Sequence, residues 1–320
     1  MRHPTPASRP LARRAALPHA AVAVAVAALA LTGCSANSAA PAGTDAASSS
    51  VAAAGSLLDP SAVHTVEIEA DPDELAAAMT TYLDTEEKVW VSATVTIDGT
   101  QLHDVGLRLK GNSSLRTVSP DADPATLPWL VRLDRTVEGQ AYAGLTSFVI
   151  RSSTTTSALN EAVALDLLAM AGLASEASAS ARLSVNGGEE TLRLLVENPD
   201  ERWDAAAFAA DGILYKAEAT GDYSYRGDDP AAYEDVFDQE TTDASGEEDL
   251  APLIELLQFV NEADDATFAA ELADHLDVDA FATYLALEDL VDNFDDIAGP
   301  GNNSYLRYDT QSGVFTVVAW

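Results

Sequence analysis

The run from Lys88 to Asn112 alternates apolar and polar residues on both sides of the pair Asp98-Gly99. A period of two places every second side chain on one face of a strand, and Asp-Gly favours the tight turn of a β-hairpin. The run therefore predicts a hairpin. Residues 181–197 repeat the pattern around Asn186-Gly187-Gly188 and predict a second hairpin.

The segments around these hairpins predict further strands and helices. Residues 64–70 alternate like a strand, and residues 71–84 begin with Asp-Pro and acidic residues, as helices often do. Residues 157–172 carry apolar residues at helical spacing, with Ser157 at the N-cap and Gly172 at the C-cap. Other strands are predicted at residues 129–135, 145–152 and 212–219, and other helices at residues 203–210, 249–263, 265–276 and 277–293.

The order of these elements predicts an α+β fold. Strands dominate the first part of the chain, helices follow, and strands return at the end. The acidic run 221–248 shows no periodicity, so we expect a loop there.

The N-terminus has the pattern of a bacterial lipoprotein signal. Residues 1–33 combine a basic start, the short apolar run AAVAVAVAALA and the first three residues of the motif LTGC, Leu31 to Cys34. The only cysteine, Cys34, closes that motif, so we expect it to carry lipid rather than to be a buried core cysteine. Residues 34–60 are rich in Ala, Ser and Gly and predict a flexible linker, which leaves residues 61–320 as the folded domain. These features predict secretion and anchoring by lipid to the outer face of the cytoplasmic membrane.

The charge of the chain limits its partners. The formal net charge is −35, and the only lysines are Lys88, Lys110 and Lys216. Such a chain has no basic face for a phosphate backbone, so we expect no nucleic acid binding. The acidity suits a solvated surface in an extracellular setting, with an acidic partner-binding role as the alternative.

Common catalytic and zinc-binding motifs are missing from the sequence. The five histidines are scattered, and neither HExxH, CxxC, GxSxG nor GxxxxGK[ST] occurs. With Cys34 assigned to lipid, a thiol nucleophile is also excluded. Oxygen and ammonium groups remain as the candidates for chemistry.

Two stretches could serve a phosphate group. The turn RLKGNSS offers Lys110, Ser113 and backbone N–H groups, although an ordinary polar turn explains it as well. Glu197 and Lys216 end two predicted strands, and a nucleotide site needs a cation at its phosphates and often an acid that holds the cation. An exposed Lys and an exposed Glu would give the same pattern.

The loop after residue 291 gathers oxygen ligands. Asp292, Asp295 and Asp296 lie at the end of a predicted helix, where the helix dipole does not stabilise carboxylates. Mg²⁺ takes one or two carboxylates together with phosphates and water, so the loop is a candidate Mg²⁺ site. A polar turn that caps the helix is the alternative reading.

Taken together, the motifs resemble the CotH family of spore-coat kinase-like proteins over about residues 63–320. The stretches that carry the resemblance, in order, are VGLRLKGNSS, QAYAGL, SALNEAVALDLL, ARLSVNGGEETLRLLVEN, GILYK, NFDDIAGPGNNSYLRYD and GVFTVVAW. The resemblance implies an atypical protein-kinase-like fold that binds ATP and Mg²⁺ and phosphorylates Ser or Thr of other exported proteins. It further implies a β-rich N-terminal part with hairpins and a helical C-terminal part followed by a β-hairpin.

The resemblance also implies roles for single residues. Asp295 matches the catalytic Asp of the family's N-x-D loop and contributes to the metal site, and Asn303 matches a metal ligand. Lys216 is expected at the nucleotide phosphates, with Lys110 and Ser113 in the KGNSS turn as further contacts. Glu197 matches the acid that follows the second hairpin.

The end of the given sequence departs from the family pattern. The family follows this last strand with Pro-Trp-Asp-x-Asp, whereas here Ala319 precedes Trp320 and the metal-binding Asp does not follow. We therefore expect the sequence to be a fragment of a longer protein, with a truncated and catalytically impaired protein as the alternative. Three functions stay open: a secreted kinase, a non-catalytic surface or assembly protein with the same fold, and a structural loop stabilised by Ca²⁺.

Overall fold

The computed structural model describes residues 56–116, 118–152, 155, 157–219, 221–298 and 303–319. The expected signal segment, Cys34 and most of the expected linker lie outside these residues. Leu57 and Leu58 belong to the range expected to be linker, yet both are buried in the first hydrophobic core. The folded part therefore begins a few residues before residue 61, because two leucines gain stability when their side chains leave water.

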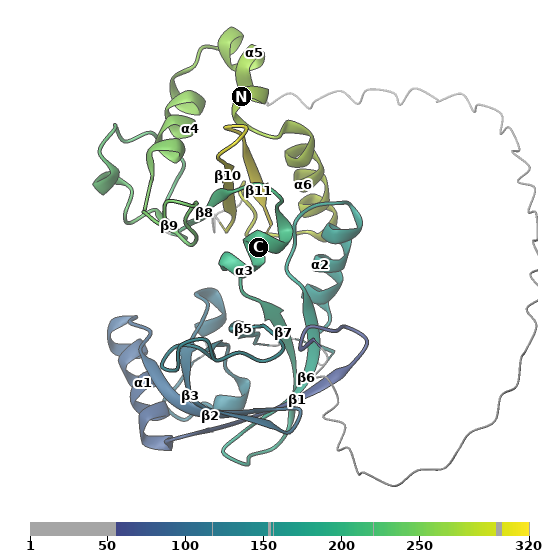
Figure 1. The fold of residues 1–320 in the computed structure, drawn as a ribbon. Helices are drawn as coiled ribbons and strands as arrows, with labels where there is room; N and C mark the ends of the chain where they lie inside the picture. Colours follow the sequence, from purple (N-terminus) through teal and green to yellow (C-terminus); the bar gives the residue numbers. More distant parts are fainter. Residues whose placement is uncertain are drawn as a thin grey trace, which may run out of the picture. The chain divides into compact units, whose positions relative to one another are not determined.

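Within the described residues, seven strands close into a barrel in the order β1-β2-β3-β4-β5-β7-β6 (Figure 1). All neighbours in it are antiparallel except β1 and β6, whose parallel pairing closes the barrel. The strands are β1 (Val63–Ala70), β2 (Trp90–Ile97), β3 (Thr100–Leu109), β4 (Trp129–Arg132), β5 (Ser147–Ile150), β6 (Ser178–Val185) and β7 (Thr191–Glu197). Both predicted hairpins are confirmed: β2 pairs with β3 and β6 with β7.

The alternate apolar side chains of the strands fill the interior of the barrel. Val91, Ala93, Val95 and Ile97 are buried at alternate positions of β2 and belong to the first core. The helix α1 (Pro72–Thr85) begins where the sequence predicts, with the Asp71 side chain accepting a hydrogen bond from the backbone N–H of Asp73.

The second β-sheet of the described residues has the order β11-β10-β8-β9. Its strands are β8 (Gly212–Ala217), β9 (Phe237–Gln239), β10 (Tyr305–Asp309) and β11 (Phe315–Val318). The helices around it are α2 (Asn160–Met170), α3 (Glu201–Ala207), α4 (Ala251–Glu262), α5 (Asp265–His275) and α6 (Val278–Val291). The remaining short elements are single 3₁₀ turns: η1 (Ser113–Leu115), η2 (Pro124–Thr126) and η3 (Pro230–Ala232). A second core lies between this sheet and its helices, so the α+β class is confirmed.

Of the two caps predicted for α2, the N-cap is wrong and the C-cap is confirmed. Ser157 does not cap α2, because Ala158 takes a positive φ of 52° and the helix begins only at Asn160. Gly172 has φ 85°, and the N–H of Leu173 reaches the carbonyl of Leu168, so the predicted glycine C-cap is confirmed.

The run 221–248 is more than a surface loop. It contains β9, and Tyr233, Val236 and Phe237 are buried in the second core. The segment therefore helps to hold the second sheet in place, although its buried residues follow no regular period.

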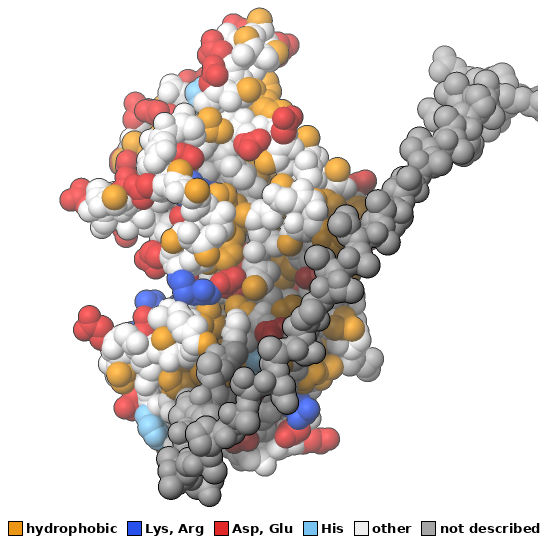
Figure 2. All heavy atoms as spheres, turned by 45° about the vertical axis from the view of Figure 1, so that its right-hand side comes forward, with side chains coloured by type: hydrophobic (Ala, Val, Ile, Leu, Met, Phe, Trp, Pro, Cys, Tyr) orange, Lys and Arg blue, Asp and Glu red, His pale blue; other side chains and the backbone are white. Residues whose placement is uncertain are grey.

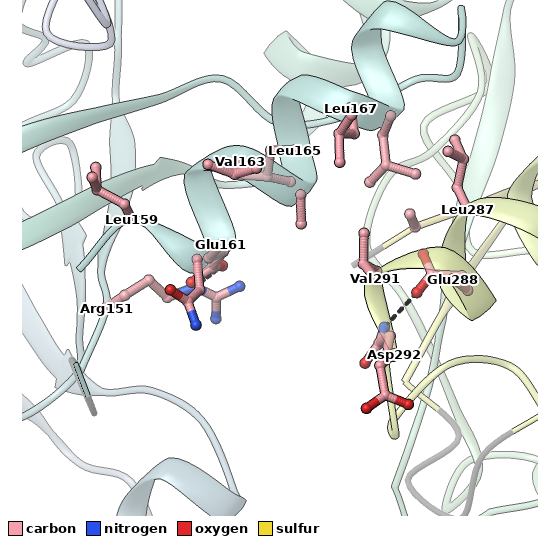
Figure 3. Close-up of a pocket in the computed structure, with 15 residues that line it drawn as sticks. Arg151, Leu159, Glu161, Val163, Leu165, Leu167, Leu287, Glu288, Val291 and Asp292 are labelled. Carbon is pink, nitrogen blue, oxygen red and sulfur yellow. Dashed lines mark hydrogen bonds and ion pairs between the residues drawn. The ribbon is translucent and has the colours of Figure 1, made fainter. Parts of the chain in front are cut away.

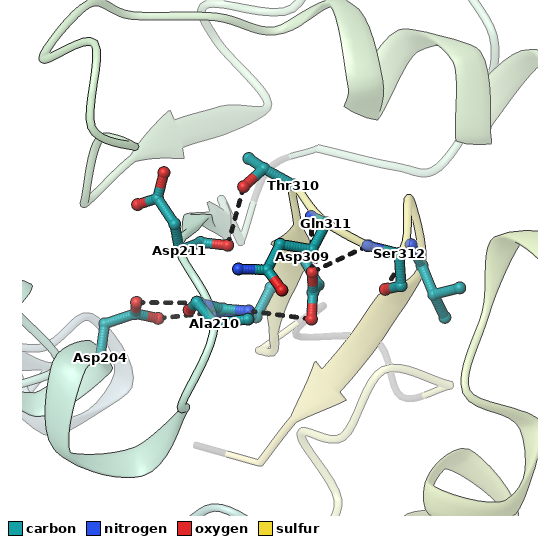
Figure 4. Close-up of polar contacts among 9 residues, drawn as sticks. Asp204, Ala210, Asp211, Asp309, Thr310, Gln311 and Ser312 are labelled. Carbon is teal, nitrogen blue, oxygen red and sulfur yellow. Dashed lines mark hydrogen bonds and ion pairs between the residues drawn. The ribbon is translucent and has the colours of Figure 1, made fainter.

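An ion pair joins α3 to β10 (Figure 4). The Arg307 guanidinium is 2% exposed, and its Nε donates to Asp204 Oδ1 at 3.1 Å. It also approaches Asp309 and donates to the carbonyl of Ala210. Gly212 lies so close to Arg307 that a side chain there would collide with it.

Candidate functional site

The KGNSS turn follows directly on β3. The N–H of Lys110 donates to the carbonyl of Pro128 at 3.1 Å, which ties the start of the turn to the segment before β4. Gly111 has φ 104°, a conformation that side chains disfavour, and the 3₁₀ turn η1 follows. The turn thus needs its glycine and holds Ser113 beside Lys110.

A cavity of about 470 Å³ opens at this turn and is called the lysine pocket below. All three lysines of the chain, Lys88, Lys110 and Lys216, line it. Figure 2 shows acidic side chains scattered over the visible face and a group of Lys and Arg side chains at one place on it. In a chain with a net charge of −35, the gathering of every lysine in one cavity marks a site for an anion.

The strands position these lysines. Lys110 follows the last residue of β3, and Lys216 lies on β8, where it pairs with Tyr305 of β10. Arg116 and Arg151 add two more cations to the lining. The expected contacts Lys110, Ser113 and Lys216 are therefore brought together in one cavity.

Crowding and burial change the protonation of the lysines. Burial and the charge of the nearby Lys216 lower the pKa of Lys110 to about 7, although the negative charge of Glu240 opposes the shift. Burial also lowers the pKa of Lys88. An anion in the pocket would offset both effects, because it favours the charged amines.

Acidic side chains hold some of these cations in place. Lys216 Nζ donates to Glu218 Oε1 at 2.6 Å. Although burial opposes the ionisation of Glu218, its contacts with Lys216 lower its pKa. Burial and the charge of Glu218 raise the pKa of Asp238 on β9.

Arg151 and Glu161 form a second ion pair, which sequence reasoning missed. Arg151 follows β5 and Glu161 lies in the first turn of α2, with Nε and Oε1 2.6 Å apart. Both line the lysine pocket. A signal was present in the sequence: an Arg directly after the apolar run of a strand, and a Glu at the start of the following helix.

The loop after α6 brings Asp295 and Asn303 to the same cavity. The side-chain oxygen of Asn293 accepts the N–H of Asp295 at 3.1 Å, and its amide donates to the buried Glu288 at 2.6 Å. Asn293 therefore links the loop to α6 and orients the segment that carries Asp295.

The other aspartates of this loop have different surroundings. Asp292 ends α6 with φ 56° and lines a neighbouring groove, while Asp296 accepts the N–H of Ala298 at 3.0 Å. Among the described residues, no cluster of three or more His, Cys, Asp or Glu side chains could hold a metal ion. An Mg²⁺ ion at this site would rely on Asp295, Asn303 and oxygen atoms of its ligand.

Glu197 is placed elsewhere. It is not among the residues that line the lysine pocket, and its carboxylate pairs with Arg202 and accepts the N–H of Ala177 at 3.2 Å. Glu197 lies at the end of β7 and Arg202 in α3, so their ion pair links the two elements. The role of Glu197 in nucleotide binding stays a prediction, as does the lipidation of Cys34, which lies outside the described residues.

An apolar groove of about 600 Å³ adjoins the lysine pocket (Figure 3). Leu159, Val163 and Leu167 line it from the side of α2, and Leu287 and Val291 from α6. Arg151 and Glu161 line both cavities.

Comparison with known proteins assigns the family. The model of the CotH kinase protein family matches residues 107–320. The chain therefore belongs to the CotH family, and the resemblance seen in the sequence is confirmed. It is similar to the inner spore coat protein H of Bacillus subtilis (strain 168), with 27% identity over 169 residues, 51% of this chain and 45% of that protein. The chain thus spans about half the length of the curated relative that it matches. In the described part of the chain, no helix is both long and apolar enough to cross a membrane.

Proposed function

We propose that the chain is an extracytoplasmic protein kinase of the CotH family, with an atypical kinase-like fold, that transfers the γ-phosphoryl group of ATP to Ser or Thr of exported proteins. One observation carries the proposal. The three lysines of a strongly acidic chain line a single cavity that also holds Asp295. The name of the family and of its relative, a spore coat protein, supports both the activity and a surface or coat location.

The residues that line the lysine pocket fit a nucleoside triphosphate. Lys88, Lys110 and Lys216 supply ammonium groups, and the KGNSS turn supplies hydroxyls at the same cavity. The lowered pKa of Lys110 reflects its burial and the neighbouring cations, and a bound phosphate would favour the charged amine. Asp295 and Asn303 are hard oxygen ligands of the kind that Mg²⁺ prefers.

The proposed transfer needs few groups. Asp295 accepts the proton of the Ser or Thr hydroxyl while the hydroxyl oxygen bonds to the γ-phosphorus. The bond from this phosphorus to the β,γ-bridging oxygen breaks at the same time. ADP leaves with the electron pair of that bond. The lysines stabilise the charge on the phosphates, and Glu218 and Glu161 hold Lys216 and Arg151 in position. Mg²⁺, held by Asp295 and Asn303, would neutralise charge on the phosphates.

A non-catalytic binding protein is the second candidate. It is favoured by the small number of metal ligands from the loop after α6, because Asp295 and Asn303 are the only acidic or amide side chains of that loop's described residues that line the cavity. Such a protein would bind the nucleotide without transferring phosphate.

The decisive experiment measures phosphate incorporation from labelled ATP into the full chain itself, with and without Mg²⁺. We expect Asp295→Asn to lower the rate by about 100-fold or more, since it removes the proton acceptor. Asp274→Asn, an exposed position on α5, is the matched control and should leave the rate unchanged. Incorporation that survives Asp295→Asn would refute the catalytic assignment, and ATP binding without any incorporation would favour the binding protein.

We also propose that the chain reaches the outer face of the cytoplasmic membrane through lipid on Cys34. The proposal rests on residues 1–34 of the sequence. Mass spectrometry of the mature N-terminus would test it, and an unmodified Cys34 would contradict it.

A further inference from the structure

A second charged cavity, of about 720 Å³, lies beside the lysine pocket and is called the arginine cavity. Trp90, Arg108 and Arg135 line it on the side of the barrel, and Asn198 and Asp200 between β7 and α3. Lys110 lines both cavities. Of the residues expected to contact the nucleotide, Lys110 alone is among the described residues that line the arginine cavity, and the proposed phosphate transfer assigns no role to Arg108 or Arg135.

Two guanidinium groups lie against one indole ring in this cavity. The Cζ atoms of Arg108 and Arg135 are 4.8 Å and 5.3 Å from the centroid of Trp90. Gly106 makes this arrangement possible, because a Cβ atom there would lie 2.7 Å from the Cβ of Arg135 and 3.0 Å from the Trp90 ring. The missing side chain at Gly106 on β3 thus leaves the space in which Arg135 packs against the indole ring of Trp90.

Burial lowers the pKa of Arg108, and the negative charge of Glu240 opposes this shift without forming an ion pair with it in the described part of the chain. Among the residues that the structure describes, neither Arg108 nor Arg135 forms an ion pair. The Nε of Arg108 is buried and has no hydrogen-bond acceptor in the described structure. A buried N–H without an acceptor costs free energy, which an acceptor on a ligand would recover.

Two of the carboxylates that line the cavity, Asp134 and Asp200, are engaged with other groups. Asp134 binds Arg132 at 3.1 Å. Asp200 accepts the Ser147 hydroxyl at 2.7 Å and caps α3. Glu240 is buried, which raises its pKa and favours its neutral form, although Lys110 opposes the shift. Glu201 lies in the first turn of α3, where the helix dipole stabilises its charge.

We infer that the arginine cavity is a second anion site, in which Arg108 and Arg135 bind a phosphate or carboxylate group beside Trp90. A planar guanidinium can donate two parallel hydrogen bonds to such a group, and its contact with the indole fixes its plane in advance. The anion can belong to a small phosphorylated ligand or to acidic side chains of a bound protein. The site does not depend on kinase activity.

The test titrates pyrophosphate into the full chain and follows the fluorescence of Trp90, with Trp90→Phe to identify the signal. Lys216→Met weakens the lysine pocket and isolates the second site. We expect this variant still to bind pyrophosphate, and the added substitution Arg135→Gln to weaken binding by about tenfold or more, the loss of one charge-assisted contact. Arg182→Gln, exposed on β6, removes the same charge elsewhere and should change little.

A second variant tests whether the position of the Arg135 side chain matters, without removing its charge. Gly106→Ala forces the Arg135 side chain off its present position and should weaken pyrophosphate binding in the same direction. Thermal unfolding confirms that each variant is folded; Arg135 is exposed, so its replacement leaves the barrel core intact. Equal affinity in the Lys216→Met protein with and without Arg135→Gln would overturn the inference.

The source of the anion is identified by a parallel titration with an aspartate-rich peptide. Binding of the peptide in preference to pyrophosphate, lost in Arg135→Gln, assigns the cavity to acidic side chains. Preference for pyrophosphate assigns it to a phosphorylated small ligand. If neither binds the Lys216→Met protein, the cavity is not an anion site, whatever the outcome of the kinase assay.

Discussion

At the scale of single residues, burial sets the charge of the candidate site. Lys110 is a lysine whose pKa falls to about 7 because it is buried beside other cations. Between that pKa and its ordinary value the folded protein binds fewer protons than the unfolded chain. The contribution of Lys110 to the free energy of unfolding therefore rises with pH across this window.

The effect of pH on anion binding has the opposite sign. Lys110 attracts an anion only when charged, so the affinity for ATP should fall as the pH rises above about 7. The fall can reach about tenfold per pH unit, because the proton must be taken up again on binding. Lys110→Arg keeps its charge and should show a flatter profile in calorimetric titrations. Parallel profiles for the two proteins would exclude Lys110 as the titrating group.

The sequence predicts the candidate phosphate and metal contacts of the site but not the ion pair that supports them. Lys110, Ser113, Lys216, Asp295 and Asn303 were singled out and line one cavity. Their chemistry is visible in the sequence, since lysines are rare and the oxygen ligands are clustered. Partners are harder to predict, because an ion pair depends on how two elements pack. The pair between Arg151 and Glu161 is formed only when α2 lies next to the end of β5.

At the scale of elements, local sequence signals predict the hairpins correctly, whereas no such signal predicts which distant strands close the barrel. Asp98-Gly99 and Asn186-Gly187 each specify a hairpin, because the turn and the alternation agree. The pairing of β1 with β6 joins segments more than 100 residues apart, and no local pattern reports it. Likewise, the burial of Tyr233 and Phe237 follows from their tertiary contacts in the second core.

The ion pair between Asp204 and Arg307 gives a prediction at this scale. Asp204→Ala leaves the buried guanidinium of Arg307 without its carboxylate, so we expect a loss of about 3–5 kcal/mol in the free energy of unfolding. Denaturant titration measures this loss. Asp274→Ala, an exposed acid on α5, serves as the control and should change stability by well under 1 kcal/mol. A loss for Asp204→Ala as small as that of the control would show that the pair does not hold α3 to β10.

At the scale of the whole molecule, charge is distributed unevenly. The chain has 52 acidic residues and 17 lysines and arginines, yet all three lysines line one pocket and Arg108 and Arg135 share the next. Acidic residues over the rest of the surface repel anions. An anionic ligand would therefore bind where the cations are gathered. Under the proposed function, the ligand of the lysine pocket is a nucleotide.

Calorimetric titration of Mg²⁺–ATP into the full chain tests whether the lysine pocket binds ATP. We expect saturable binding that Lys216→Met weakens by about tenfold or more, as expected when a charged contact is removed. Arg182→Met, which removes one positive charge outside the pocket, should leave the affinity nearly unchanged. The absence of saturable binding, or an equal loss of affinity in both variants, would contradict the account.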